Sequence, residues 1–225
     1  MGTNIGGWKP PSAPPMEAGT YVARCTGVID LGVQKTTWEG KERLTPQILL
    51  IFEFPTELIE YDGEKRPRWI SQKYTKSIDP KAKLRHHLQA WRGCDFTDQE
   101  MHDFDIARVL NAACTIVVSH TEKNGNYYAN ISSIGQMMKG IPTPADVVKQ
   151  FHFDIDDEGT WACFADLPEW IQALINGSET FREAGIQISK DGKRVDVASS
   201  KTAETGNQIP ASYDELDMDD GELPF

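Results

Sequence analysis

The sequence lacks the features of a membrane-spanning or secreted protein. No apolar run approaches the ~20 residues that a transmembrane helix needs. The N-terminus has no basic stretch followed by an apolar one, as a secretory signal would have. The four cysteines, Cys25, Cys94, Cys114 and Cys163, show no paired spacing, which argues against a disulfide framework and favours a reducing compartment. We therefore expect a soluble, cytoplasmic protein with no membrane partner.

The sequence also lacks motifs for phosphate binding, metal binding and catalysis. It contains neither Gly-x-x-x-x-Gly-Lys-Ser/Thr nor Gly-x-Gly-x-x-Gly. Residues 154–159 start like a calcium-binding loop, but its twelfth position is Ala165, where a glutamate would hold the ion. The histidines and cysteine of residues 86–102 match no standard zinc spacing. Residues 62–65 fit a hairpin turn better than a nuclease metal site. We expect no cofactor, no metal and no enzymatic activity.

The formal net charge of −11 is concentrated in the C-terminal part of the chain. Residues 1–140 carry 17 basic and 16 acidic side chains, whereas residues 141–225 carry 6 and 18. The balanced first part is compatible with nucleic-acid binding, although the whole chain is acidic. From about residue 189 hydrophobic residues thin out, and residues 214–222 hold six carboxylates. We predict a disordered linker and an acidic tail over residues 189–225.

Residues 20–31 are predicted to form a long, bent strand around which the fold is organised. Tyr21 and every second residue up to Leu31 fall on one face, the pattern of a half-buried strand. Gly27 interrupts this strand, and a glycine inside a strand usually marks a bulge or a bend at a barrel corner. The residues after it, 32–45, are predicted to be a polar loop.

Four more strands are indicated further along the chain. Residues 48–54 are apolar on both faces, as in a central strand, and residues 68–74 have the pattern of a half-exposed strand. Residues 114–119 and 127–134 are joined through Asn124-Gly125, a strong signal for a tight hairpin.

The pattern changes to a helical period between the third and fourth strands. Asp79-Pro80 opens a helix and Gly93 ends it. Thr97 and Glu100 have the spacing of a capping box for a second, short helix. The apolar stripe of the first helix consists of Leu84, Leu88 and Trp91.

These elements predict a mainly β protein with α insertions. Five strands with a helix between the third and fourth are the layout of the oligonucleotide-binding (OB) barrel. We place a five-stranded OB-type barrel at residues 19–140, with the helical insert between strands 3 and 4. A proline-rich arm over residues 1–18 precedes it, and a small appended α/β segment over residues 141–188 follows. Within that segment we expect two helices, over residues 143–151 and 167–176, and a short strand over residues 161–164.

Basic and aromatic side chains alternate in the proposed strands and loops. Single-stranded nucleic acid needs cations along its backbone and flat faces for its unpaired bases, and each stacked base contributes ~1–3 kcal/mol whatever its identity. The alternative is that the aromatic residues lie in the core and the charges form a solvated rim. Tyr127 and Tyr128 point to opposite faces, so at most one of them stacks on bases, and Trp91 is expected in the core. The candidate contacts are Trp38, Arg43, Arg66, Arg68, Trp69, Lys73, Tyr74, Lys76, Lys123 and Tyr127.

The chain ends with a carboxylate cluster followed by an aliphatic residue, proline and phenylalanine. This ending resembles the acidic tip of the single-stranded DNA-binding proteins of bacteria and their phages. Residues 20–139 are similar to an OB-type phage replication protein, notably from Tyr74 to Gly93. The resemblance implies that the tip docks into basic, apolar pockets of replication and repair proteins. The tip residues are Asp217, Asp219, Asp220, Glu222, Leu223, Pro224 and Phe225.

The bacterial proteins lack so large a helical insert and the segment after Lys139. Their tetrameric assembly is therefore not carried over, and the oligomeric state stays open, a monomer included. The same departure favours a phage source, and hence the cytoplasm of a bacterial host cell.

We therefore expect a non-catalytic protein that coats single-stranded DNA in replication, recombination or repair. Stacking and phosphate contacts would bind the strand with little sequence preference. The tail would recruit partners and, as a tethered polyanion, compete with DNA for the basic groove. One alternative is a protein-interaction or recombination adaptor whose tail mimics DNA. Another is a metal-dependent nuclease.

Overall fold

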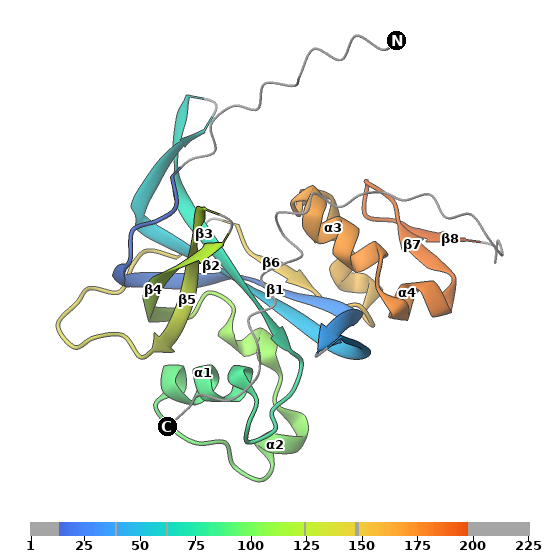
Figure 1. Cartoon of the computed structure of the whole chain (residues 1–225), viewed down its shortest axis with the longest axis horizontal. Coiled ribbons are helices and arrows are strands. Elements are labelled where there is room, and N and C mark those ends of the chain that lie inside the picture. The colour runs from blue at the N-terminus through green and yellow to red at the C-terminus, as the bar shows by residue number, and fades with distance from the viewer. Residues whose placement is uncertain (1–13, 39, 62, 124, 147–148, 198–225) are drawn as a thin grey trace.

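A strongly curled antiparallel sheet forms half a barrel (Figure 1). The computed structural model describes residues 14–38, 40–61, 63–123, 125–146 and 149–197. Across the sheet the strands follow in the order β3, β2, β1, β4, β5, so the protein is mainly β, as predicted. The strand bounds are β1 Gly19–Trp38, β2 Lys41–Tyr61, β3 Glu64–Thr75, β4 Ala113–Lys123 and β5 Asn126–Gly135.

Two bulges in β1 change which side of the sheet its residues face. The pairing with β2 skips one residue between Cys25 and Gly27 and another between Asp30 and Gly32. An extra residue inverts the alternation that follows it. Cys25 therefore lies in the core of the half-barrel, whereas Ile29 and Leu31 lie in a second apolar cluster on the opposite side. The prediction of a bulge near Gly27 is confirmed, but the prediction that Tyr21 through Leu31 share one face is wrong.

The paired strands β1 and β2 continue well beyond their predicted ends. Their ladder reaches Trp38 and Lys41, so residues 32–45 form a two-stranded ribbon and not the predicted polar loop. An exposed ribbon needs no apolar alternation, so the hydrophobic pattern could not reveal it. Two-residue turns connect β2 to β3 and β4 to β5. Their described glycines, Gly63 and Gly125, have positive φ angles of 78° and 77°, and both predicted turns are confirmed.

Helix α1 (Lys83–Arg92) packs against β3 and β5 at one end of the half-barrel (Figure 1). Its apolar stripe is buried in the barrel core, as predicted, and the Trp91 ring lies 5.7 Å from that of Phe52. Gly93 ends the helix in the left-handed region, with φ at 70°. The stripe consists of Leu84, Leu88 and Trp91.

Two shorter helices complete the connection to β4. In the predicted capping box, the Glu100 backbone N–H donates to Thr97 Oγ1 (3.2 Å), and the Thr97 backbone N–H donates to Glu100 Oε2 (3.0 Å). These helices are α2 (Glu100–Asp103) and the 3₁₀ helix η1 (Ile106–Val109).

An N-terminal segment, residues 14–18, links β3 to β4 across the half-barrel. The described parts of β3 and β5 approach each other but form no ladder. Arg68 of β3 donates from Nη1 to the Pro14 carbonyl (2.6 Å), and His120 of β4 donates from Nε2 to the Met16 carbonyl (2.7 Å). The Met16 side chain is only 4% exposed and belongs to the barrel core. The segment therefore completes the core where the sheet does not close.

Residues 149–197, called the C-terminal unit below, cover the opposite face of β1 and β2. Strand β6 runs parallel to β1, with Phe151 beside Gly27 and Phe153 beside Ile29. The helices of the unit pack against β1 (Figure 1) and bury the second apolar cluster, which includes Leu49 and Ile51 of β2. Its elements are β6 Phe151–Phe153, η2 Glu158–Asp166, α3 Glu169–Asn176, α4 Glu179–Ala184, β7 Ile186–Ile188 and β8 Arg194–Asp196.

Three details of this region differ from the predictions. The described residues of the range 143–151 form no helix, and their last residue begins β6. Residues 161–164 lie in the 3₁₀ helix η2, where the Trp161 indole donates to the Asp154 carbonyl (2.9 Å), and not in a strand. The β7–β8 hairpin extends past residue 189, where the linker was predicted to start, because polar hairpins carry little hydrophobic signal. No described helix is both long and apolar enough to cross a membrane.

Candidate nucleic-acid interface

Alternation along β2 and β3 divides the predicted contacts between two faces. Ile48 lies opposite Tyr74, and both side chains point into the half-barrel; we call this side the barrel face. Leu49 lies opposite Lys73 on the other side, which we call the outer face. Because strand side chains alternate, the odd-numbered contacts belong to the outer face and the even-numbered ones to the barrel face. The outer-face set is Arg43, Trp69 and Lys73, and the barrel-face set is Arg66, Arg68 and Tyr74.

Trp69 is the exposed aromatic residue of the outer face. Its side chain remains 42% exposed although it sits in the middle of β3. The indole N–H donates to Glu53 Oε2 (3.0 Å), the residue opposite on β2. The ring also meets that of Phe151 edge-on, at a centroid distance of 5.5 Å and an angle of 76°. These two contacts hold an aromatic ring in place while part of it faces water.

Cations accompany Trp69 on the outer face. Lys73 is half-buried and lies on the same face of β3, four residues further along the strand. Arg43 and Lys41 are exposed on β2. Strand β2 has no extra residue up to Glu53, so its odd-numbered residues lie on the same face as Leu49. Among the described side chains, the outer face thus carries an open ring and basic groups spread along it. Lys73 is the nearer one, whereas Arg43 lies ten residues along β2 from Glu53, the residue opposite Trp69.

For two predicted contacts the structure describes the backbone but not the side chain. The backbone of Trp38 pairs with Lys41, and that of Lys123 pairs with Asn126. The side chains of Trp38 and Lys123 are outside the described part of the chain.

Tyr74 is buried, so its predicted role as a stacking platform is wrong. It is 3% exposed, and its hydroxyl shares a 2.8 Å hydrogen bond with His87 Nδ1. Burial raises the pKa of Tyr74 above its usual value and lowers the pKa of His87 to about 4, so both groups are neutral at pH 7. The pair is part of the core of the half-barrel.

Lys76 is committed to an ion pair and lies outside the candidate interface. Its ammonium contacts Oδ2 of the buried Asp30, whose Oδ1 accepts the Gly32 backbone N–H (2.8 Å). Burial opposes the charged form, but the hydrogen bond and charge of Asp30 raise the pKa of Lys76 above its usual value. Removing Lys76 from Asp30 would leave a buried carboxylate without its cation, so a phosphate gains little by competing for it.

The remaining predicted contacts lie on or beside the barrel face. Arg66 pairs with Glu64 (2.7 Å), and Arg68 is bonded to the N-terminal segment. Tyr127 is 56% exposed, and its ring lies 6.3 Å from that of His120 on β4. The structure therefore does not bring Arg68 or Tyr127 together with Trp69.

Two residues of the interface region were missed in the sequence. Phe151 supports the Trp69 ring, and the Lys149 ammonium lies over Phe151 at 5.4 Å from its centroid. Lys149 and Phe151 show the same basic–aromatic spacing as the predicted contacts, but they fell in a range interpreted as a helix. The basic–aromatic pattern was present, but it was not counted among the contacts because the range was interpreted as a helix.

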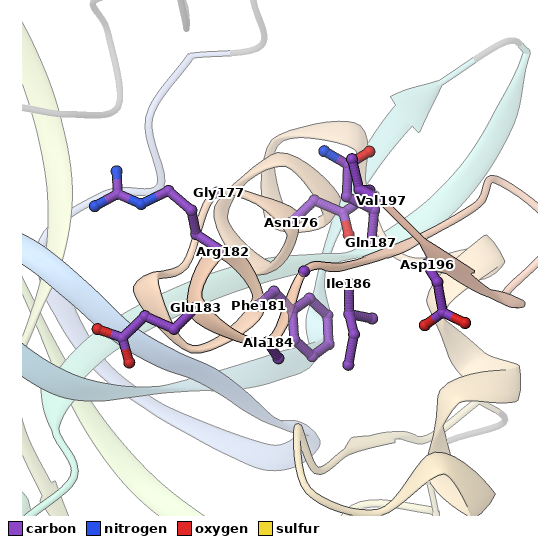
Figure 2. Close-up of a pocket in the computed structure, with 11 residues that line it drawn as sticks. Asn176, Gly177, Phe181, Arg182, Glu183, Ala184, Ile186, Gln187, Asp196 and Val197 are labelled. Carbon is purple, nitrogen blue, oxygen red and sulfur yellow. The ribbon is translucent and has the colours of Figure 1, made fainter. Parts of the chain in front are cut away.

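A pocket of about 610 Å³ opens in the C-terminal unit between α4 and β7 (Figure 2). Phe181 and Ile186 form its apolar part, whereas the charged ends of Arg182 and Glu183 point away from them. Arg182 is also paired with Glu179. This lining shows no arrangement of acid, base or nucleophile, and within the described residues no three His, Cys, Asp or Glu side chains are grouped to hold a metal ion.

The tip residues from Asp217 to Phe225 lie outside the described part of the chain. Protein-family models and curated proteins were compared with the sequence, and neither comparison found a match.

Proposed function

We propose that this chain binds single-stranded DNA without catalysis and with little sequence preference, through the outer face of β2 and β3. Trp69 stacks on an unpaired base, and the cations further along the same face contact phosphates. Proteins of replication, recombination or repair bind the acidic tail.

The strand order supports an OB-type barrel as the framework for this function. OB-folds are five-stranded, partly open Greek-key barrels that bind oligonucleotides on the face of strands 2 and 3. Here β3, β2, β1, β4 and β5 are neighbours in that order, and α1 comes between β3 and β4. The outer face of β2 and β3 corresponds to the surface that such barrels use.

The observation that carries the proposal is an exposed, fixed indole on the same face of the sheet as basic side chains. A base stacked on Trp69 contributes ~1–3 kcal/mol, and stacking is tolerant of sequence because every base has a flat face. Phosphate contacts from Lys73 and Arg43 add affinity that depends on salt but not on sequence. A duplex offers Trp69 no free base, so single strands are preferred.

The C-terminal unit determines the path of the strand. It covers Leu49 and Ile51, the centre of the outer face of β2, but leaves Trp69 and Lys73 on β3 accessible. A bound strand therefore follows β3 and continues along β2 past Arg43.

The test is a titration of the full chain with labelled oligo-dT and with a duplex of equal length, across a salt series. We expect tight, salt-sensitive binding to the single strand only. Trp69→Ala should weaken that binding about 5- to 150-fold, the equivalent of ~1–3 kcal/mol, and Trp69→Phe should weaken it less. Equal affinity for both nucleic acids, or an unaffected Trp69→Ala variant, would contradict the proposal. Cleavage of the oligonucleotide with Mg²⁺ would support the nuclease alternative.

The tail modulates this binding as a tethered polyanion. Replacing the six carboxylates of residues 214–222 by their amides should tighten DNA binding, most strongly at low salt. The matched variant lacks residues 223–225 and keeps the carboxylates, so its DNA affinity should match that of the full chain. Unchanged affinity after charge removal would reject the competition.

A further inference from the structure

Lys149 lies where the C-terminal unit meets the outer face of β3. Its ammonium is 5.4 Å from the centroid of the Phe151 ring, and that ring is 5.5 Å from the Trp69 ring. The three side chains form one cluster, in which Phe151 is buried and Trp69 is exposed. Lys149 is therefore near the site of a base stacked on Trp69.

The position of Lys149 is fixed by β1. Its carbonyl accepts a hydrogen bond from Oγ1 of Thr26 (2.6 Å), the extra residue of the first bulge, which is fully buried. Two residues later, Phe151 pairs with Gly27. The backbone of Lys149 is thus held against the same sheet that carries Trp69, and such support favours a defined binding geometry.

The ammonium of Lys149 has only a weakly held partner. It pairs with Asp166 Oδ1 at 2.9 Å, and the two side chains are about half exposed. Exposed pairs of this kind contribute ~0–1 kcal/mol. A phosphate can therefore replace Asp166 at little cost, in contrast to the buried Asp30 that holds Lys76.

We propose that Lys149 binds the phosphodiester backbone of the single strand next to the base on Trp69. This inference rests on the proposed function and adds to it a residue outside the barrel. The C-terminal unit then forms one side of the DNA path. Asp166 stays paired with the Lys149 ammonium until a phosphate displaces it.

The first test removes the charge of Lys149 and compares salt dependence. One phosphate contact to a single strand contributes about 0.7 to the slope of log K against log salt, which corresponds to about fivefold in affinity at 0.1 M salt. Lys149→Ala should lose that contribution, and its binding should converge with that of the unaltered chain near 1 M salt. The matched control is Lys193→Ala, which breaks a pair of equal length, with Asp191 (2.9 Å), on the β7–β8 hairpin. The control should bind like the unaltered chain.

The second test should strengthen DNA binding, whereas the first should weaken it. Asp166→Asn removes the competitor of the phosphate, so it should tighten binding to oligo-dT, whereas Asp191→Asn should not. An ion pair with a purely structural role would give no gain in affinity from Asp166→Asn.

The outcomes separate this inference from the proposed function. If Lys149→Ala behaves like Lys193→Ala while Trp69→Ala still weakens binding, the inference is wrong and the proposed function stands. Equal losses in both lysine variants indicate an effect of net charge and also overturn it. If the unaltered chain does not bind oligo-dT, both proposals fail.

Discussion

The outer face and the barrel face of β2 and β3 carry the same kinds of side chain in different circumstances. On the outer face, Trp69 is partly exposed beside Lys73. On the barrel face, Tyr74 is buried against His87, and Arg68 is bonded to the N-terminal segment. Alternating basic and aromatic residues in a strand therefore describe two surfaces, and of Trp69 and Tyr74 only Trp69, on the outer face, is exposed.

The largest difference between the faces is expected in stability. Tyr74→Ala leaves a cavity in the barrel core and should lower the free energy of unfolding by ~3–5 kcal/mol, the range for large aromatic truncations. Trp69→Ala should cost far less, because much of that ring is already in water. Urea unfolding measures both variants. A stable Tyr74→Ala variant that had lost DNA binding would place Tyr74 in the interface, and would contradict the assignment of DNA binding to the outer face.

A fall in pH should lower the stability of the fold through His87, which is bonded to Tyr74 of the barrel face. Burial, followed by the nearby charges of Lys83 and His86, lowers the pKa of His87 from 6.5 to about 4. Between these values the unfolded chain binds a proton that the folded chain does not, so stability falls as the pH drops from 6.5 to 4. The total loss is at most about 3 kcal/mol. Urea unfolding at pH 7 and pH 4.5 should show it, and His87→Asn should flatten the pH dependence. An exposed-histidine control, His102→Asn, should leave it intact.

Two arginines on opposite faces give a matched pair for DNA binding. Arg43→Ala on the outer face should reduce the salt slope by about 0.7 and the affinity about fivefold at 0.1 M salt. Arg68→Ala on the barrel face should change neither, because its guanidinium is bonded to the Pro14 carbonyl. The reverse result would move the DNA path to the side of Tyr127.

The smallest effect concerns Glu53, the acceptor for the Trp69 indole. Glu53→Gln keeps an acceptor oxygen for the ring and removes a negative charge beside the proposed phosphates. Binding to oligo-dT should tighten by less than one phosphate contact, below about fivefold at 0.1 M salt, and the gain should vanish at high salt. Weaker binding would show that the carboxylate itself is needed to hold Trp69.

The features predicted correctly from the sequence are local. The stripe of α1, its end at Gly93 and the turn at Gly125 depend on residues within about four positions of one another. The capping box at Thr97 is of the same kind. Such signals act before any tertiary contact forms, so they can be read from the sequence alone.

The features that were missed depend on register between distant segments. A bulge near Gly27 was predicted, but its extra residue, Thr26, cannot be identified without knowing how β1 pairs with β2. Phe151 reaches β1 only because β6 adds to it more than a hundred residues later in the chain. Lys73 and Tyr74 were predicted as contacts of one interface, although alternation places neighbouring side chains on opposite sides of β3. Which side is buried depends on these pairings.

The bulge at Thr26 makes the two apolar clusters inseparable. Upstream of it β1 lines the half-barrel, and downstream Ile29 and Leu31 support the C-terminal unit. A shortened chain ending near residue 140 would leave these two side chains, with Leu49 and Ile51, as a bare aliphatic surface in water and would be prone to self-association. Heating the intact chain should accordingly melt both clusters in a single transition.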